Sequence, residues 1–130
     1  MKKNSINVIH LGAGPVGLNV ITLLLAKKRV RLVGVVDINP ALVGKPLISL
    51  IPQGKSELLV TDKVAEVLAL QKVDVAVVTT SSSATVVAEQ IRPLLLAGVS
   101  VVTTCEELSY PWKAHATVAH ELDALAKQHN

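Results

Sequence analysis

Aromatic residues and cysteine are scarce in this sequence. Among its 130 residues there is no phenylalanine, and Tyr110 and Trp112 are the only tyrosine and tryptophan. Proteins that hold single-stranded nucleic acids usually stack aromatic side chains on the bases, so the composition argues against a nucleic-acid partner. Cys105 is the only cysteine and has no second thiol for an internal disulfide, which is typical of the reducing cytoplasm. We therefore expect a cytoplasmic protein that does not bind nucleic acid.

Long hydrophobic runs and a strong charge of one sign are also missing. No apolar stretch reaches the roughly 20 residues that a membrane-spanning helix requires, so no membrane contact is expected. The net charge is only +3, and the basic run 27–29 stands where a helix should end and where cations complement the helix dipole. This pattern favours a helix cap over a surface for polyanions.

The histidines do not form a metal-binding pattern. His115 and His120 are five residues apart on an expected helix, so they do not share a face closely enough to bind one ion. His10 lies at the end of an apolar strand, and we interpret it as a satisfied histidine of the core or its rim rather than as a catalytic group. The sequence therefore predicts no metal site.

The most informative motif is rich in glycine. Segment 12–17 has the sequence GAGPVG and stands between an apolar strand-like segment and an apolar helix-like segment. A pyrophosphate can lie against a helix N-terminus only where no Cβ keeps the backbone away. Gly12 would permit the tight turn, Gly14 the close approach of a phosphate, and Gly17 the close packing of helix on strand. Pro15 suits the first helical turn. The arrangement is typical of a dinucleotide-binding βαβ unit.

An acidic residue follows at the distance expected for such a unit. Asp37 lies twenty residues beyond Gly17 and directly follows a second apolar strand. Its carboxylate could accept hydrogen bonds from both hydroxyls of an adenosine ribose and would repel a 2′-phosphate. The expected cofactor is therefore NAD, although Asn39 and Lys45 in the next loop leave NADP possible.

Strands and helices alternate along the chain. The strands are expected at 6–11, 31–36, 58–60, 73–79 and 99–103. The helices are expected at 16–26, at 62–70 with Asp62 as the cap, at 84–97 and from about 111 to 128, with only short helical turns in the loop 38–57. Half of the residues are hydrophobic and nearly all of these are aliphatic, as in a parallel sheet covered by helices on both faces. Residues 1–130 are thus expected to form a single α/β domain, a Rossmann-type doubly wound parallel sheet.

Three segments should meet at the carboxyl edge of this sheet, where such folds bind their ligands. They are the glycine loop, the hydroxyl-rich segment 79–83, and segment 103–112, which holds the only Cys, Tyr and Trp. The hydroxyl-rich segment could contact the cofactor or could be ordinary loop and cap material. The expected cofactor-binding residues are Gly12, Gly14, Pro15, Val16, Gly17, Asp37, Thr79, Thr80, Ser81, Ser82, Thr104 and Cys105.

Segment 101–112, with the sequence VVTTCEELSYPW, resembles an element of the 2,4-diaminopentanoate dehydrogenase group, relatives of dihydrodipicolinate reductase. The glycine loop and segments 37–45 and 77–82 are also similar to that group. The resemblance extends over essentially the whole chain, but only to the N-terminal, NAD(P)-binding domain of such enzymes. It implies that the C-terminal domain for substrate binding and oligomerisation is absent from this chain.

The resemblance further implies an NAD(P)-dependent oxidoreductase acting on a CH–NH2 group or reducing a C=N bond. Hydride would pass between nicotinamide and the amine-bearing carbon of a small diamino acid, in an enzyme that is expected to be a homo-oligomer. Glu106 or Glu107 could attract the substrate ammonium or relay a proton, or both could be solvated residues. Tyr110 and Trp112 could form a wall near the nicotinamide or pack against the last helix. The isolated chain is expected to bind the dinucleotide without turnover, and a free-standing nucleotide-binding or scaffolding module is the alternative.

Overall fold

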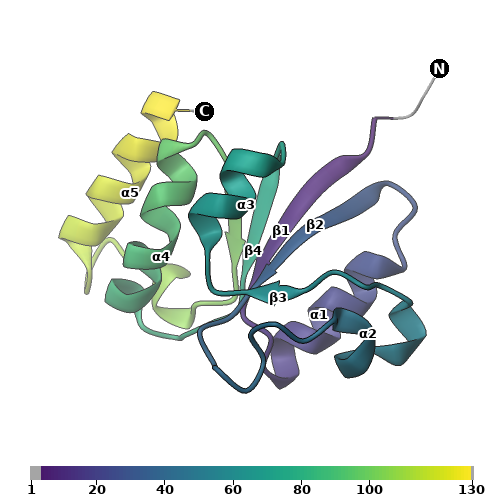
Figure 1. Cartoon of the computed structure of the whole chain (residues 1–130). Coiled ribbons are helices and arrows are strands. Elements are labelled where there is room, and N and C mark those ends of the chain that lie inside the picture. The colour runs from purple at the N-terminus through teal and green to yellow at the C-terminus, as the bar shows by residue number, and fades with distance from the viewer. Residues whose placement is uncertain (1–3, 130) are drawn as a thin grey trace.

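The computed structural model describes residues 4–129 and has an open parallel β-sheet at its centre (Figure 1). The strands of this sheet are β1 (Ile6–Leu11), β2 (Val30–Val36), β3 (Val60–Thr61), β4 (Val75–Val78) and β5 (Ser100–Thr103). Their spatial order is β3-β2-β1-β4-β5, so the direction of winding reverses between β1 and β4. This confirms the predicted doubly wound sheet of Rossmann type, and the reversal between β1 and β4 is the switch point of such folds.

Helices cover both faces of the sheet. They are α1 (Pro15–Leu25), α2 (Leu47–Leu50), α3 (Val64–Leu70), α4 (Ala84–Leu96) and α5 (Ala116–His129), with the short 3-10 helices η1 (Pro52–Gly54) and η2 (Glu106–Leu108). In Figure 1, α1 and α2 lie on one side of the sheet, and α4 and α5 lie on the other. Val64, Val67 and Leu68 of α3 pack against the same buried cluster as α4, so α3 belongs to the second side.

Side chains alternate between the two cores along the strands. On β2, Val36 belongs to the buried cluster beneath α4, whereas its neighbour Val35 belongs to the cluster beneath α1. On β1, Ile9 and Leu11 both face the α4 side. The buried members of the two clusters are aliphatic apart from Cys105, as the scarcity of aromatic residues predicts. Among residues 4–129, no helix combines the length and apolar character needed to cross a membrane.

The last helix begins later than the sequence predicts. The expected start is at about 111, but α5 begins at Ala116. Residues 111–115 form a separate turn, in which the N–H of His115 donates to the carbonyl of Pro111 at 2.8 Å. This turn places the ring of Trp112 edge-on against the ring of His120 on α5, with centroids 5.2 Å apart. Pro111 therefore begins this turn, and the regular helix begins only after it.

The edge strand β3 is also displaced from its predicted position. The sequence predicts a strand at 58–60, but β3 is Val60–Thr61. The carbonyl of Leu58 accepts from the N–H of Leu47 at 2.8 Å, and the N–H of Val60 donates to the carbonyl of Lys45 at 3.0 Å. The chain at 58–60 is therefore paired with the loop before α2, which leaves only two residues for the sheet.

The cap predicted for α3 is wrong. Asp62 is expected to cap this helix, but α3 begins at Val64 and no side chain caps it. The N–H of Lys63 donates to the hydroxyl of Thr61 at 3.2 Å, which turns the chain and starts the helix one residue later. The remaining elements differ from their predicted bounds by one or two residues, which is the ordinary scatter of helix and strand ends.

Candidate functional site

The glycine loop connects β1 to α1 in the close packing that the sequence predicts. Gly12 has a φ of +101°, a conformation that favours glycine. A Cβ on Gly17 would lie 2.0 Å from the carbonyl oxygen of Gly12 and 2.9 Å from the hydroxyl oxygen of Thr79. The first glycine thus makes the turn, and the third lets α1 pack on the loop and on the end of β4.

Gly14 has open space where a Cβ would stand. No atom lies within 4 Å of that position, and the residue is exposed. Gly14 is the N-cap of α1, which has neither a side-chain cap nor an acidic residue in its first turn. Pro15 and Val16 follow it and are both exposed. The backbone N–H groups of this helix start are therefore available to an anion, and glycine leaves room for its approach.

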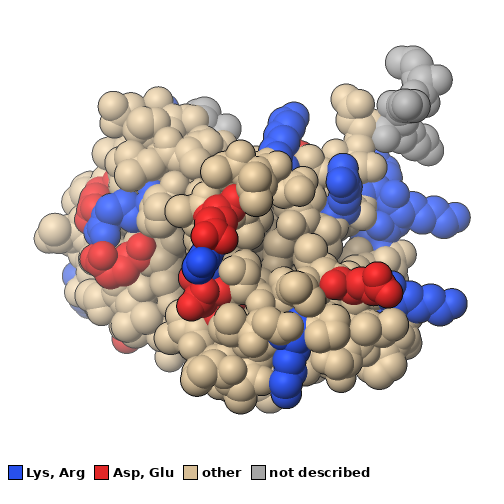
Figure 2. All heavy atoms as spheres, in the orientation of Figure 1, with Lys and Arg blue, Asp and Glu red and all other residues tan. Residues whose placement is uncertain are grey.

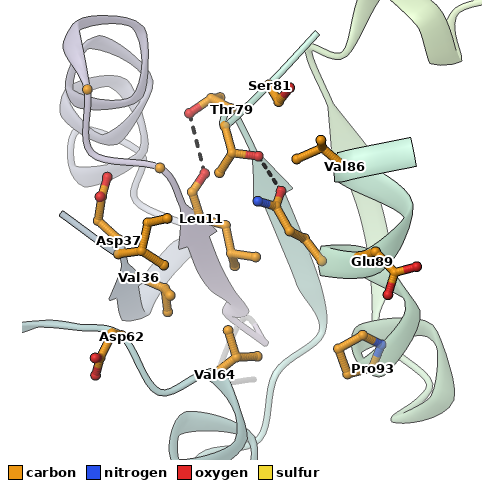
Figure 3. Close-up of a pocket in the computed structure, with 15 residues that line it drawn as sticks. Leu11, Val36, Asp37, Asp62, Val64, Thr79, Ser81, Val86, Glu89 and Pro93 are labelled. Atoms are coloured by element: carbon orange, nitrogen blue, oxygen red, sulfur yellow. Dashed lines mark hydrogen bonds between the residues drawn. The ribbon is translucent and has the colours of Figure 1, made fainter. Parts of the chain in front are cut away.

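Asp37 lies beside this loop, at the end of β2. Its Oδ2 accepts the N–H of Ala13 at 2.7 Å, and its Oδ1 accepts the N–H of Asn39 at 2.8 Å. Figure 3 shows the carboxylate directed toward the glycine loop. Each carboxylate oxygen can accept a second hydrogen bond, so Asp37 is oriented by the backbone and can still accept from a ligand.

A cavity of about 500 Å³ opens next to Asp37, between the carboxyl ends of the central strands and helices α3 and α4 (Figure 3). Its lining residues are Leu11, Gly12, Gly14, Val36, Asp37, Ile38, Asp62, Val64, Thr79, Thr80, Ser81, Val86, Glu89, Gln90 and Pro93. None of these is Lys or Arg. Glu89 forms an ion pair with Arg92 at 2.8 Å, and its carboxylate points away from the cavity. The cavity therefore has largely apolar walls, with the carboxylate of Asp37 at the end next to the glycine loop and with Asp62 and the hydroxyl residues 79–81 also in its lining.

The hydroxyl-rich segment lies partly at this cavity. Thr79, Thr80 and Ser81 line it, whereas Ser82 does not. Thr79 donates its hydroxyl to the carbonyl of Leu11 at 3.4 Å, so it links β4 to the end of β1. Ser81 accepts the N–H of Ser83 at 3.0 Å and so shapes the turn into α4.

Segment 103–112 is placed beneath the hydroxyl-rich segment and does not line the cavity. Cys105 is buried, and its thiol donates to the carbonyl of Ser82 at 3.2 Å. The N–H of Thr104 donates to the carbonyl of Val78 at 3.2 Å. These contacts hold the exit of β5 against the exit of β4. The side chain of Cys105 accordingly belongs to the core, where a structural thiol is inert.

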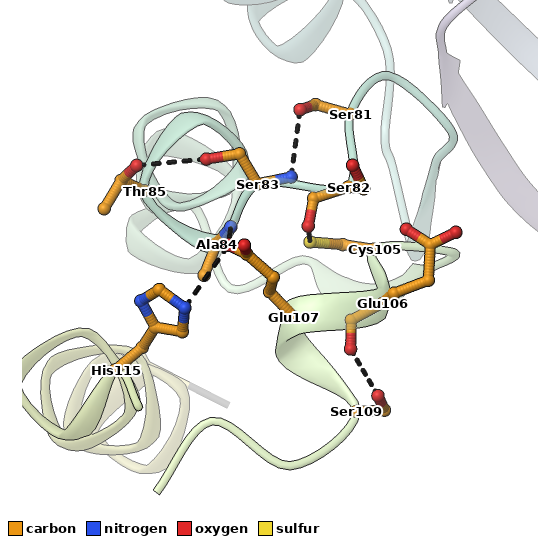
Figure 4. Close-up of polar contacts among 10 residues, drawn as sticks. All are labelled: Ser81, Ser82, Ser83, Ala84, Thr85, Cys105, Glu106, Glu107, Ser109 and His115. Carbon is orange, nitrogen blue, oxygen red and sulfur yellow. Dashed lines mark hydrogen bonds and ion pairs between the residues drawn. The ribbon is translucent and has the colours of Figure 1, made fainter. Parts of the chain in front are cut away.

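The two glutamates of this segment differ in their surroundings (Figure 4). The Oε2 of Glu107 accepts the N–H of Ala84 at 2.7 Å and lies 3.3 Å from Nε2 of His115. Glu107 thus caps the N-terminus of α4 from a distant part of the chain. The carboxylate of Glu106 points away from these residues in Figure 4, and the described part of the chain offers it no hydrogen bond or ion pair. Glu106 is therefore the glutamate that is available to a ligand.

The two aromatic residues lie away from the cavity. Trp112 is in contact with His120 and lines a groove between α4, β5 and α5, so the packing interpretation holds for it. Tyr110 is 73 % exposed. Neither ring lines the space next to Asp37.

His10 is fully buried on β1, one residue before the end of the strand. The predicted core position is confirmed, but the expectation that its ring is satisfied is wrong, because neither ring nitrogen has a hydrogen-bond partner. Burial lowers the pKa of His10 to about 4, since the charged form loses its hydration. The nearby backbone of Gly12 opposes this lowering, but the contact lacks the geometry of a hydrogen bond.

Basic side chains gather at the opposite end of the sheet. Figure 2 shows Lys and Arg beside the amino-terminal ends of β1 and β2. The exposed run Lys27, Lys28 and Arg29 lies just beyond α1 rather than in its last turn, so the predicted cap is displaced by a few residues. Within residues 4–129, no group of three or more His, Cys, Asp or Glu is placed to bind a metal ion. An anion at the start of α1 would be held by backbone N–H groups rather than by lysine or arginine.

Ile38, Val86 and Gln90 are among the cavity-lining residues that sequence reasoning did not single out. Ile38 follows Asp37 directly, and Val86 and Gln90 are four residues apart on α4. The signal for Ile38 was its position just after a predicted strand, because residues there face the carboxyl edge of the sheet. The i, i+4 spacing also places Val86 and Gln90 on one face of a helix.

The fold and this loop define a class: the nucleotide-binding domain of Rossmann-type oxidoreductases. Dehydrogenases of known structure or sequence resemble this chain. The solved amine dehydrogenase from Mycobacterium smegmatis is 37 % identical, with a TM-score of 0.87 over 95 % of this chain and 36 % of its own. The 2,4-diaminopentanoate dehydrogenase of Acetoanaerobium sticklandii is 28 % identical over 95 % of this chain and 35 % of its own length. GenD2 from gentamicin A biosynthesis, solved in complex with NAD, is 27 % identical with a TM-score of 0.69, over 97 % of this chain and 32 % of its own.

The chain thus matches the N-terminal domain of the 2,4-diaminopentanoate dehydrogenase group, which confirms the resemblance found in the sequence. It spans about a third of the length of these relatives. No model of a known protein family matches the sequence.

Proposed function

We propose that this chain is the NAD-binding domain of an oxidoreductase that acts on the carbon–nitrogen bond of a small diamino acid. The observation that carries the proposal is the open space at Gly14, at an uncapped helix start beside the carboxylate of Asp37. This arrangement fits a pyrophosphate followed by a ribose. The bound nicotinamide would supply the hydride chemistry, and the chain would bind and orient it.

The choice of NAD over NADP rests on charge. Asp37 stands where the adenosine ribose would lie, and a 2′-phosphate there would meet a carboxylate with no Lys or Arg among the lining residues. Asn39 and Lys45, which made NADP possible in the sequence, do not reverse this preference for NAD. Asn39 uses its side-chain oxygen to accept the N–H of Ala41 at 2.9 Å, and Lys45 does not line the cavity.

Calorimetric titration of the chain with NADH and NADPH tests the proposal. NADH should bind more tightly than NADPH by about tenfold or more, because like charges oppose each other in the second complex. Gly14→Ala should weaken NADH binding by about tenfold or more, since the added methyl group displaces the phosphate from charge-assisted N–H donors. The same substitution should leave the melting temperature unchanged, because nothing lies near the new Cβ.

Lys45→Ala is the matched control and should change neither affinity. If the wild-type chain binds neither dinucleotide, the proposal is wrong. If NADPH binds as tightly as NADH, the domain binds a dinucleotide but Asp37 does not select it.

For the substrate side we propose Glu106 as the residue that attracts the ammonium group. The names of two relatives, an amine dehydrogenase and a 2,4-diaminopentanoate dehydrogenase, support a substrate with an amino group. Glu106 has an exposed carboxylate without a partner in the described residues, whereas that of Glu107 is engaged by the N–H of Ala84. A cationic substrate would therefore gain an ion pair with Glu106 at no cost to the fold.

Alanine substitutions separate the two glutamates. Glu107→Ala should lower the free energy of unfolding by about 1 kcal/mol, the usual effect of losing a helix cap, whereas Glu106→Ala should leave it unchanged. With NAD bound, Glu106→Ala should weaken association of 2,4-diaminopentanoate more than Glu107→Ala does, as measured by calorimetry. Equal weakening by both variants would contradict the assignment of Glu106.

A further inference from the structure

We propose that Gln90 recognises the adenine base of the dinucleotide through its side-chain N–H groups, an inference that rests on the function proposed above. Gln90 lies on α4 and lines the cavity next to Asp37. It is the only residue among those lining the cavity whose side chain carries N–H donors. The ring nitrogens of adenine are acceptors, so this donor matches the chemistry of the base.

The order of the ligand groups places the base near Gln90. A phosphate at Gly14 and a ribose at Asp37 use the end of the cavity formed by the glycine loop. The base would then enter the rest of the cavity, which is lined by Ile38 and by residues of α4. A cavity of about 500 Å³ has room for it.

The apolar side chains that line this part of the cavity are exposed to solvent. Ile38 is 86 % exposed and Val86 is 47 % exposed, and both line the cavity. A flat ring between them would remove apolar surface from water, which is favourable. Apolar walls alone do not distinguish one base from another, so a polar group is needed for selection.

Thr80 fixes the orientation of the Gln90 amide. The hydroxyl of Thr80 donates to the Oε1 of Gln90. This leaves the Nε2 group of the amide with two donors that have no hydrogen-bond partner among the described residues, and it restricts rotation of the side chain. Thr80 is therefore a positioning residue, and Gln90 is the residue that would contact the base.

Titration of Gln90→Met with NADH and with adenosine diphosphate ribose tests this inference. Methionine keeps the length of the side chain and removes its donors. We expect both ligands to bind about fivefold more weakly, the usual effect of losing one neutral hydrogen bond. Equal loss for the two ligands would place the effect at the adenosine end, because adenosine diphosphate ribose has no nicotinamide.

Two further variants complete the experiment. Thr80→Val keeps the amide but removes its anchor, so it should weaken both ligands by a smaller factor, and it also serves if Gln90→Met unfolds. Gln128→Met is the matched control, since it makes the same change on α5, away from the residues that line the cavity, and it should change neither affinity. Wild-type affinity in both Gln90→Met and Thr80→Val would overturn the inference, whereas failure of the wild type to bind NADH would overturn the proposed function itself.

Discussion

Gly17→Ala should lower the free energy of unfolding by about 3 kcal/mol, at the upper end of the usual cost of overpacking. The new Cβ would lie 2.0 Å from the carbonyl oxygen of Gly12, which is backbone and cannot rotate away. The N–H of Gly12 donates to the carbonyl of Val36 at 2.8 Å, so the loop is also held to β2. Relief of the clash would require α1 to move away from the sheet. Urea denaturation followed by circular dichroism would measure the loss.

Gly14→Ala provides the matched control, because it makes the same chemical change three residues earlier. Gly14 has φ −73° and ψ −175°, which alanine adopts without strain, and nothing lies within 4 Å of the new methyl group. Its free energy of unfolding should stay within about 0.5 kcal/mol of the wild type. Equal stability of the two variants would show that the loop is looser than the structure indicates.

Stability should fall as the pH is lowered from about 6.5 to 4, because of His10. The pKa of its ring is about 4 in the folded chain and 6.5 in the unfolded chain, so between these values the unfolded state binds more protons. Above pH 7 the ring is neutral in both states and makes no difference. At pH 5 the folded chain should be less stable than at pH 8 by about 2 kcal/mol from this group alone. Urea denaturation at half-unit intervals of pH would measure the slope.

His10→Leu should remove most of this slope, because it keeps a buried side chain of similar size without a titrating group. His129→Gln serves as the control, since this histidine is exposed at the end of α5. The carboxyl of Asp74, whose pKa is lowered chiefly by the N–H of Asn7, should still cause a loss at more acidic pH in both variants. An unchanged slope between pH 6.5 and 4 in His10→Leu would contradict the assignment.

Most of the fold could be predicted from local patterns in the sequence. The glycine motif, the apolar strands and their alternation with helices predicted the doubly wound parallel sheet and the layers of helices on both of its faces. The exceptions arose where a backbone pairing or a side-chain contact with another segment accompanies the change of an expected element. The chain at 58–60 pairs with the loop before α2 instead of extending β3, and the turn at 111–115 packs Trp112 on α5 instead of continuing it. No local propensity contains such pairings.

For the candidate site, the sequence identified the glycine loop and Asp37 but could not show which of the neighbouring residues line the cavity. Of the predicted residues, Gly12, Gly14, Asp37, Thr79, Thr80 and Ser81 line the cavity, while Cys105 lies in the core. The sequence around these residues does not show which of them face the cavity. Only the packing of β5 beneath the hydroxyl-rich segment shows that Cys105 is buried while the others line the cavity. The same packing engages the carboxylate of Glu107 at α4 and leaves that of Glu106 exposed.

The sequence by itself determined the class of fold and the place of the ligand edge, because glycine spacing, strand periodicity and the acid after the second strand are local properties of the backbone. The tertiary structure alone decided which side chains face that edge. Contacts between residues far apart in the chain buried His10 without a partner, turned Glu107 into a helix cap, and brought Gln90 to the cavity beside Asp37. These outcomes depend on which side chains are buried, and which backbone groups find hydrogen-bond partners, when the helices pack on the sheet.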